Sequence, residues 1–220
     1  MLTVLRSIRR WWYRPRLLTS RAAYRLWAAA YPPQAHNPFM ELEERLMLAH
    51  LPPVTRLRML DLACGTGRYT RLLTERGASS VVSLDHSLDM LAHGIAPCAA
   101  QADMTALPLP AACLDGIVCG LAIGHVADLQ AALSEIGRVL REGGFALVSD
   151  LHPRLKDARA QRTFSAQGQT YAIEHYWHSE ADYKQALQAT GLELVTQHAA
   201  SLPDRSDEPL VWVGVLRKGI

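Results

Sequence analysis

The run from Met59 to Gly67, which reads Met-Leu-Asp-Leu-Ala-Cys-Gly-Thr-Gly, constrains the fold of this chain most strongly. An apolar segment ends there in small residues and two glycines, and a helix-forming stretch follows at once. Glycines at such a junction let the backbone turn sharply and leave amide groups exposed at a helix N-terminus, where a polar or anionic ligand can approach. The run therefore predicts a buried strand followed by a ligand-binding turn.

Short apolar runs alternate with longer amphipathic stretches from Arg58 to about Pro153, which is typical of βα units around a mostly parallel sheet. The expected strands are Arg58–Ala63, Ser80–Leu84, Gly116–Cys119 and Phe145–Ser149, and the expected helices are Tyr69–Arg76, Ser87–Ala92 and Asp128–Leu140. The pattern predicts the α/β fold class.

The pattern changes after Arg154. A polar stretch without periodicity, Lys156–Gln169, precedes a short expected strand, a helix and two further strands, which are Thr170–His175, Ser179–Thr190, Leu192–Thr196 and Val211–Leu216. Because the last two strands are joined by a modest turn-rich loop, we expect an antiparallel pair at a sheet edge.

The first 50 residues are basic and aromatic, with no acidic residue before Glu41. We expect helices at Arg21–Ala30 and Pro38–His50, forming a cap or lid (residues 1–50) on a domain spanning residues 51–220 with an acceptor-side insertion near 151–183. The alternative for the basic segment is a weak contact with an anionic membrane surface.

Composition narrows the class of protein. The 220 residues fit one ordinary domain, and a net charge of +2 is too small to favour a nucleic-acid partner. The four cysteines show no CxxC spacing, which indicates reduced thiols and a cytoplasmic protein. The oligomeric state stays open.

Two acidic residues narrow the ligand of the glycine turn. Asp85 ends the next expected strand, 20 residues after Gly65, where an acid accepts hydrogen bonds from ribose hydroxyls. An NAD-dependent oxidoreductase shares that feature, but Thr70 stands where its third glycine belongs. Asp61 suits a ligand that carries an ammonium group, which a dinucleotide lacks.

Asp61–Gly67 resembles the first motif of class I S-adenosylmethionine-dependent methyltransferases, in the style of the quinone-biosynthesis and malonyl-carrier methyl ester branches of methyltransferase type 11. Further motifs of that family are matched in order by the segments Asp85–Leu91, Ala102–Pro110, Leu114–Asp128 and Glu135–Gly144. The resemblance covers roughly Leu57 to Asp150.

That resemblance implies a Rossmann-like sheet of seven strands, six parallel and the last reversed, with helices on both faces and an N-terminal helical lid. It implies S-adenosyl-L-methionine as cofactor and no metal, with Asp85 at the ribose and Asp103 at the adenine amino group. The expected cofactor residues are Asp61, Ala63, Gly65, Gly67, Asp85, His86, Met90, Asp103, Met104 and Leu121.

The expected reaction is in-line transfer of the methyl group to a small-molecule acceptor. His125 and His152 are the catalytic candidates because histidine can act as a general base near neutral pH. The acceptor wall is expected to hold Tyr31, His152, His175, His178 and Tyr183.

Other functions stay open at this level. A non-catalytic module that binds S-adenosylmethionine or S-adenosylhomocysteine is the first alternative, and an NAD-dependent oxidoreductase is a weaker one. A metal half-site at His152, His175 and His178 is weaker than a pocket wall. The acceptor, and whether its O, N, C or S atom is methylated, does not follow from these residues.

Overall fold

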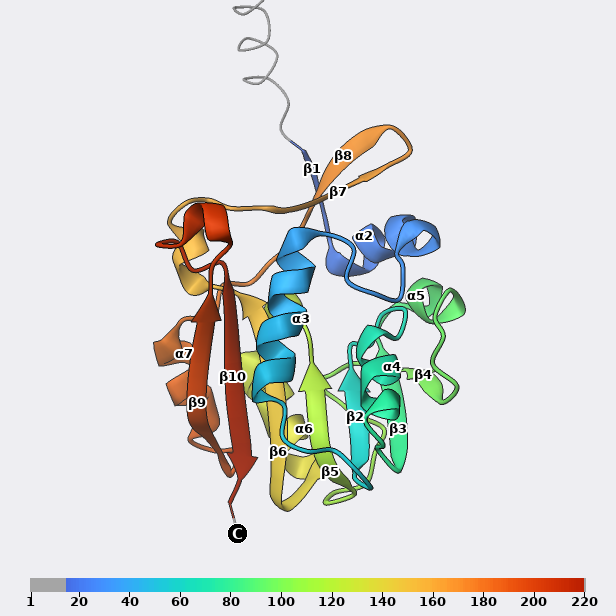
Figure 1. The fold of residues 1–220 in the computed structure, drawn as a ribbon, viewed down its shortest axis with the longest axis vertical. Helices are drawn as coiled ribbons and strands as arrows, with labels where there is room; N and C mark the ends of the chain where they lie inside the picture. Colours follow the sequence, from blue (N-terminus) through green and yellow to red (C-terminus); the bar gives the residue numbers. More distant parts are fainter. Residues whose placement is uncertain (1–14, 220) are drawn as a thin grey trace, which may run out of the picture.

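The computed structural model describes residues 15–219. A seven-stranded sheet forms the centre of the molecule, helices cover both of its faces, and a smaller three-stranded sheet stands at one end (Figure 1). The hypothesis of a membrane contact rests mainly on residues 1–14, which lie outside the described residues. Within residues 15–219, no helix is both long and apolar enough to span a bilayer.

The large sheet has the strand order β4-β3-β2-β5-β6-β10-β9. Its strands are β2 (Arg58–Leu62), β3 (Ser80–Asp85), β4 (Ala99–Gln101), β5 (Leu114–Cys119), β6 (Leu140–Leu151), β9 (Leu192–Ala200) and β10 (Val211–Lys218). Only β10 runs against its neighbours, β6 and β9. The predicted mostly parallel sheet with a reversed last strand is confirmed, as is the antiparallel pair.

Edge strand β4 was not expected from the sequence. Its three residues are all exposed, so no apolar run marks it. It is recognisable only through its parallel pairing with β3, in which Ala100 lies opposite Leu84.

Helices cover the sheet in two layers. One layer holds α3 (Pro38–His50) and α4 (Arg68–Glu75), the other holds α6 (Leu129–Val139) and α7 (Glu180–Leu187), and the short α5 (Leu88–Ala92) follows β3. Alternate strand residues face opposite layers: Met59 and Val118 pack with α3 and α4, whereas Leu60 and Ile117 pack with α6 and α7. Burial on both faces explains why these strands read as continuous apolar runs.

The helix starts follow local chemistry. Asn37 caps α3 by accepting a hydrogen bond from the Met40 amide, and Asp128 caps α6 in the same way from the Ala131 amide. Ser179 and Asp182 form a reciprocal capping box at α7. These polar residues stop the helices from extending into the preceding loops.

The smaller sheet joins two segments that are distant in sequence. Strand β1 (Arg16–Leu18) pairs in parallel with β8 (Gln169–Ile173), which forms a hairpin with β7 (Arg162–Ala166). Helix α2 (Ser20–Trp27) packs on this sheet, and its Trp27 ring stacks on Phe164 at a centroid distance of 4.8 Å. We call the unit formed by β1, α2, β7 and β8 the lid.

The lid differs from the sequence expectation. Within the stretch expected to be irregular, β7 forms around one buried residue, Phe164, with exposed Thr163 and Ser165 on either side of it. Helix α3 does not belong to the lid, since its Leu42 and Met47 pack into the core beside Val118. The expected cap of residues 1–50 is therefore divided, with α2 in the lid and α3 on the sheet.

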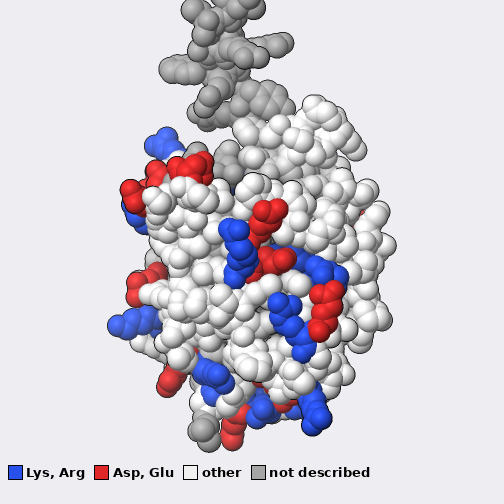
Figure 2. Space-filling model, viewed as in Figure 1, with Lys and Arg blue, Asp and Glu red and all other residues white. Residues whose placement is uncertain are grey.

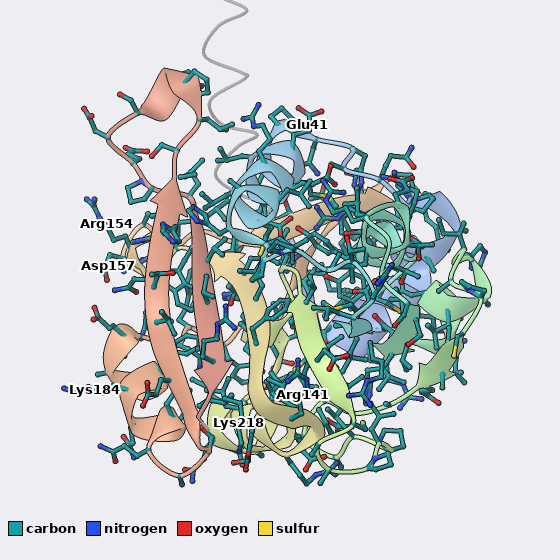
Figure 3. The ribbon with its side chains drawn as sticks, turned by 60° about the horizontal axis from the view of Figure 1, so that its bottom comes forward. Glu41, Arg141, Arg154, Asp157, Lys184 and Lys218 are labelled. Atoms are coloured by element: carbon teal, nitrogen blue, oxygen red, sulfur yellow. The ribbon has the colours of Figure 1, made fainter. Side chains whose placement is uncertain are left out.

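The charged side chains on the surface are of mixed sign. On the face seen in Figure 2, acidic and basic side chains are interspersed rather than gathered by sign. At the amino ends of the parallel strands, Arg58 and Arg141 both pair with Asp115, which holds the pKa of that carboxyl well below its usual range. Arg141 points outward at this end (Figure 3).

Gly137 provides a test of the packing between α6 and the turn after α7. A Cβ atom at Gly137 would lie 2.5 Å from the Thr190 carbonyl oxygen, which is backbone and cannot move freely. Gly137→Ala is expected to lower the free energy of unfolding by about 1–3 kcal/mol despite the better helix propensity of alanine.

Urea denaturation of the full chain measures this effect. The matched control is Gly219→Ala, where the nearest atom to a Cβ would be the Gly191 oxygen at 3.9 Å. Equal stability of the two variants would contradict the close packing at Gly137.

Candidate functional site

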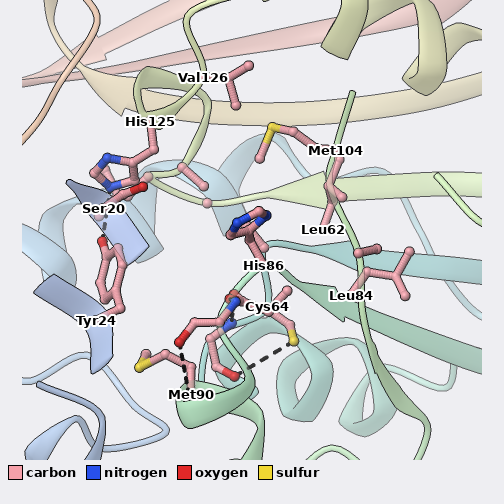
Figure 4. Close-up of a pocket in the computed structure, with 18 of the residues that line it drawn as sticks. Ser20, Tyr24, Leu62, Cys64, Leu84, His86, Met90, Met104, His125 and Val126 are labelled. Atoms are coloured by element: carbon pink, nitrogen blue, oxygen red, sulfur yellow. Dashed lines mark hydrogen bonds between the residues drawn. The ribbon is translucent and has the colours of Figure 1, made fainter. Parts of the chain in front are cut away.

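A cavity of about 360 Å³ lies at the carboxyl ends of β2, β3 and β5, beneath the lid. Its walls come from the loops after these strands, around Gly65, Asp85 and Leu121, and from the lid residues Tyr24 and Arg162. Figure 4 shows Ser20, Tyr24 and His125 on one side of the cavity and Leu62, Leu84 and Met104 on the other. We call it the first cavity.

Asp61 holds the glycine turn in place. One of its carboxylate oxygens accepts hydrogen bonds from the Thr70 amide at 2.6 Å and from the Thr70 hydroxyl at 2.7 Å, and that hydroxyl also meets Ser83 at 2.7 Å. The end of β2 is thereby tied to the first turn of α4. Burial raises the pKa of Asp61 to about 6 although both Thr70 hydrogen bonds act in the opposite direction.

The turn itself needs left-handed backbone. Ala63 has φ 58° and Gly65 has φ 55°, and both residues line the first cavity. Gly67 has φ 96° and does not line it; a Cβ atom there would lie 3.1 Å from Ile95. Gly67, expected to contact the cofactor, is placed instead where α4 needs a left-handed residue at its start.

Asp85 is fixed at the end of β3. One carboxylate oxygen accepts from the Gly65 amide and the other from the Ser87 amide, both at 2.7 Å. Each oxygen keeps further acceptor capacity toward the cavity, which fits a pair of ribose hydroxyls. Burial raises the pKa of this carboxyl, and the two amide hydrogen bonds lower it.

Part of the first cavity's lining is apolar. Leu84, Met90 and Met104 contribute to it, and exposed Asp103, whose side chain accepts from the Thr105 amide and hydroxyl at 2.8 Å, also lines the cavity. Apolar side chains of this kind suit a flat aromatic base. Exposed His86 also lines the first cavity.

At the other side of the first cavity, both ring nitrogens of His125 have hydrogen-bond partners. Its Nδ1 lies 3.0 Å from the Glu174 carbonyl oxygen, which only accepts, so Nδ1 carries the proton. Its Nε2 therefore accepts, from the Tyr24 hydroxyl at 3.0 Å and from Arg162 Nη1 at 3.1 Å. Burial and the Arg162 charge lower the pKa of His125 to about 3.

Buried Glu43 supports the site from behind. It pairs with Arg68 at 2.7 Å, accepts from the Tyr69 hydroxyl at 2.8 Å and accepts from the Ser149 hydroxyl. These contacts join α3 to α4 and β6. The sequence signal for Glu43 is its spacing between Met40 and Met47, which places it on the buried face of an amphipathic helix.

Four residues of the expected acceptor wall lie elsewhere. His152, His175, His178 and Tyr183 line a second cavity of about 350 Å³, which shares no lining residue with the first. Of that set only Tyr31 lines the first cavity. The separation arises because β6 ends beside β9, β10 and α7, on the other side of the Ile123–His125 turn (η2).

Tyr24 and Arg162 line the first cavity although neither was expected there from the sequence. Tyr24 lies in the basic, aromatic N-terminal stretch, of which only Tyr31 was expected at the site. Arg162 stands in the polar stretch that carries no periodicity. In the described part of the chain, no group of three or more His, Cys, Asp or Glu side chains could hold a metal ion.

Comparisons with known proteins agree with this geometry. Residues 60–148 match the family described as "Methyltransferase domain". The malonyl-[acyl-carrier protein] O-methyltransferase of Enterobacter lignolyticus is 35% identical over 133 residues, which are 57% of this chain and 53% of that protein. The matched residues 60–148 form a methyltransferase domain of the class I, S-adenosylmethionine-dependent type. The cofactor expected from the sequence, S-adenosyl-L-methionine, is thereby confirmed.

Other relatives of this methyltransferase carry different names. The demethylmenaquinone methyltransferase of Thermus thermophilus is 36% identical over 110 residues, which are 46% of this chain and 50% of that protein. The chain spans about half the length of the curated relatives it matches. The matched family segment ends at Val148 and so contains the carboxyl ends of β2, β3 and β5, which lie at the first cavity.

Solved structures confirm the fold. An S-adenosylmethionine-dependent methyltransferase from Mesorhizobium loti superposes with a TM-score of 0.69 at 24% identity, covering 80% of this chain and 97% of that one. The geranyl diphosphate C-methyltransferase of Streptomyces coelicolor, solved with S-adenosyl-L-homocysteine, gives 0.62 at 14% identity, covering 81% and 79%.

Asp85 offers a test of cofactor binding. Asp85→Ala removes the expected ribose acceptor and frees the Gly65 amide, so the Kd for S-adenosylhomocysteine is expected to rise at least tenfold, about 1.4 kcal/mol. Calorimetry on the full chain measures it. Exposed Asp89→Ala, on neighbouring α5, is the control, and equal affinity of both variants would contradict the ribose assignment.

Asp61 offers a test by pH. Its pKa in the fold, about 6, lies above its ordinary value of 3.8, so its contribution to stability is full below about pH 4 and is lost as pH rises through 6. Relative to Asp61→Asn, the wild-type free energy of unfolding is expected to fall by roughly 3 kcal/mol over that range.

Urea denaturation at several pH values measures the difference between these two curves. Asp89→Asn is the exposed control. If the difference in free energy of unfolding between wild type and Asp61→Asn stays constant with pH, the raised pKa of the buried Asp61 carboxyl is contradicted.

Proposed function

We propose that this methyltransferase transfers a methyl group from S-adenosylmethionine to the carboxylate of a small acceptor held against Arg162. The Arg162 guanidinium carries the proposal. It faces the first cavity, and no carboxylate within residues 15–219 forms an ion pair with it.

The surroundings of Arg162 explain why an anion is the fitting partner. Its Nη1 donates to the Leu121 carbonyl oxygen at 2.6 Å and lies against His125 Nε2, which orients the planar guanidinium without neutralising it. An unpaired cation in a partly enclosed cavity is costly, and a guanidinium fork matches the two oxygens of a carboxylate. The Tyr24 and Tyr31 side chains line the cavity there as well.

The chemistry needs little from the protein beyond alignment. S-adenosylmethionine supplies an electrophilic methyl carbon bound to a sulfonium. The bond from the acceptor oxygen to that carbon forms as the carbon–sulfur bond breaks, the electron pair stays on sulfur, and the acceptor leaves as a neutral methyl ester. No proton is released, so no general base is required.

The state of His125 fits a reaction without a base. Its Nε2 lone pair already accepts from Tyr24 and Arg162, and its pKa of about 3 keeps it neutral. We assign His125 the part of a positioning residue that fixes Arg162 and Tyr24. His152, the other catalytic candidate, lines the second cavity.

The relatives' names support the choice of an oxygen nucleophile. Several of them are malonyl-[acyl-carrier protein] O-methyltransferases, which act on a malonyl group. A small acceptor and a cytoplasmic location stay predictions for this chain. The alternative, a module that binds S-adenosylmethionine without turnover, differs in that it would transfer no labelled methyl group to any acceptor.

Arg162→Gln tests the proposal. Methyl transfer from labelled S-adenosylmethionine is measured with malonyl thioesters and small carboxylic acids, each beside the corresponding amide. Carboxylates are expected to be methylated and amides not, and Arg162→Gln is expected to lower kcat/KM at least 100-fold while changing the Kd of S-adenosylhomocysteine less than threefold. Above the titration range of Asp61, from about pH 7 to 8, the wild-type kcat/KM is expected to stay level, since no general base titrates.

Arg154→Gln is the control, because Arg154 is an exposed arginine of the same insertion whose side chain points away from the fold (Figure 3). Arg162→Lys should recover part of the activity, as it keeps the charge and loses the fork. Full activity of Arg162→Gln on a carboxylate would overturn the proposal.

A further inference from the structure

The second cavity, of about 350 Å³, lies where β6 ends, bounded by β9, β10 and α7. Its size is within the range of small-molecule sites. Asp150 and His175 lie at the side nearest the η2 turn, and the rings of Trp177, Tyr183 and Trp212 form much of the remaining wall. Nothing in the methyl-transfer chemistry uses these residues.

Buried polar atoms in this cavity lack partners. Neither ring nitrogen of His175 nor the Tyr183 hydroxyl has a hydrogen-bond partner among the described residues. The His175 side chain is 6% exposed and Tyr183 is 4% exposed. An unsatisfied buried polar group costs about 1–3 kcal/mol, so three such atoms beside one cavity favour a polar ligand over an apolar one.

Asp150 and His175 face one another across a gap. Asp150 Oδ2 and His175 Nε2 are 3.7 Å apart, which is too long for a hydrogen bond. The other Asp150 oxygen accepts from the Leu151 amide at 2.8 Å. Glycine at position 124 permits this arrangement, since a Cβ atom there would collide with both side chains.

The charge of the wall selects the ligand class. Two carboxylates, Asp150 and Glu180, line the second cavity, and among the described residues that line it there is no Lys or Arg. The Tyr183 and Trp212 rings pack on one another in this wall, with centroids 4.7 Å apart and planes tilted by 39°. Carboxylates beside aromatic faces attract organic cations and repel anions.

We propose that the second cavity binds a small organic amine, with its ammonium group at Asp150 and His175 and its apolar body against Tyr183 and Trp212. This site is independent of the proposed methyl transfer. Burial lowers the pKa of His175 to about 4, which leaves its imidazole neutral near pH 7 and able to accept an N–H hydrogen bond. Burial raises the pKa of Asp150 to about 7, and a bound cation favours its ionised form.

Three probes with one aromatic body and different head groups test this proposal: phenethylamine, phenethyl alcohol and phenylacetate. Calorimetry on the full chain, saturated with S-adenosylhomocysteine to fill the first cavity, measures their Kd values. Phenethylamine is expected to bind at least tenfold more tightly than the alcohol, and phenylacetate more weakly than both. Equal binding of the three probes, tighter binding of phenylacetate, or no binding would overturn the proposal.

Two variants locate the site. Asp150→Asn keeps an acceptor for the Leu151 amide and removes the charge, so the preference for the amine over the alcohol is expected to fall below threefold. Tyr183→Leu removes the ring against which the apolar body packs and is expected to weaken all three probes alike. Exposed Asp157→Asn, nearby on the outside (Figure 3), is the control and should bind as wild type does.

The remaining outcomes are equally decisive. An amine preference that persists in Asp150→Asn would place the cation elsewhere. Amine binding that appears only without S-adenosylhomocysteine would place it in the first cavity. Either result would overturn the second-cavity assignment, and neither depends on whether carboxylates are methylated.

Discussion

The hydrogen bonds from Thr70 to the Asp61 carboxylate hold together the part of the molecule on which the rest depends. Through them the end of β2 is attached to the start of α4, and the chain between must make a tight left-handed turn. The turn presents the Gly65 amide to Asp85, so two neighbouring strands are joined at the edge where the cofactor is expected. The cost is a carboxylate kept in a place where its charge is disfavoured, as its raised pKa records.

The pairing of β1 with β8 decides the acceptor side of the first cavity. It brings the chain before α2 against a hairpin some 150 residues later, and the two together place Tyr24 and Arg162 on His125. A buried histidine with two donors on one nitrogen is a fixed acceptor rather than a proton carrier. The lid therefore contributes the Arg162 guanidinium and part of the wall of the first cavity. A substrate that needs no deprotonation suits such a site best.

The two cavities are separated by a thin wall. The turn of η2 lies between them, with His125 on the first cavity and His175 on the second, and their rings stand 6.1 Å apart. The Tyr176 amide donates to the Gly124 carbonyl oxygen at 2.6 Å, so the irregular segment between β8 and α7 also fixes this wall. The two cavities therefore lie on opposite sides of one turn and share no lining residue.

The sequence by itself determined the α/β class. It also determined which residues lie at the carboxyl ends of the parallel strands, among them Asp61, Asp85 and Asp103, because apolar periodicity and glycine turns are local properties. Strands β1, β4 and β7 could not be predicted from the sequence, since each has few buried side chains and forms only by pairing with another strand. The tertiary structure alone decided that Arg162 lines the first cavity and that His152 and His175 line the second. Those placements follow from which side of β6 each loop takes, and no short-range pattern of residues encodes that side.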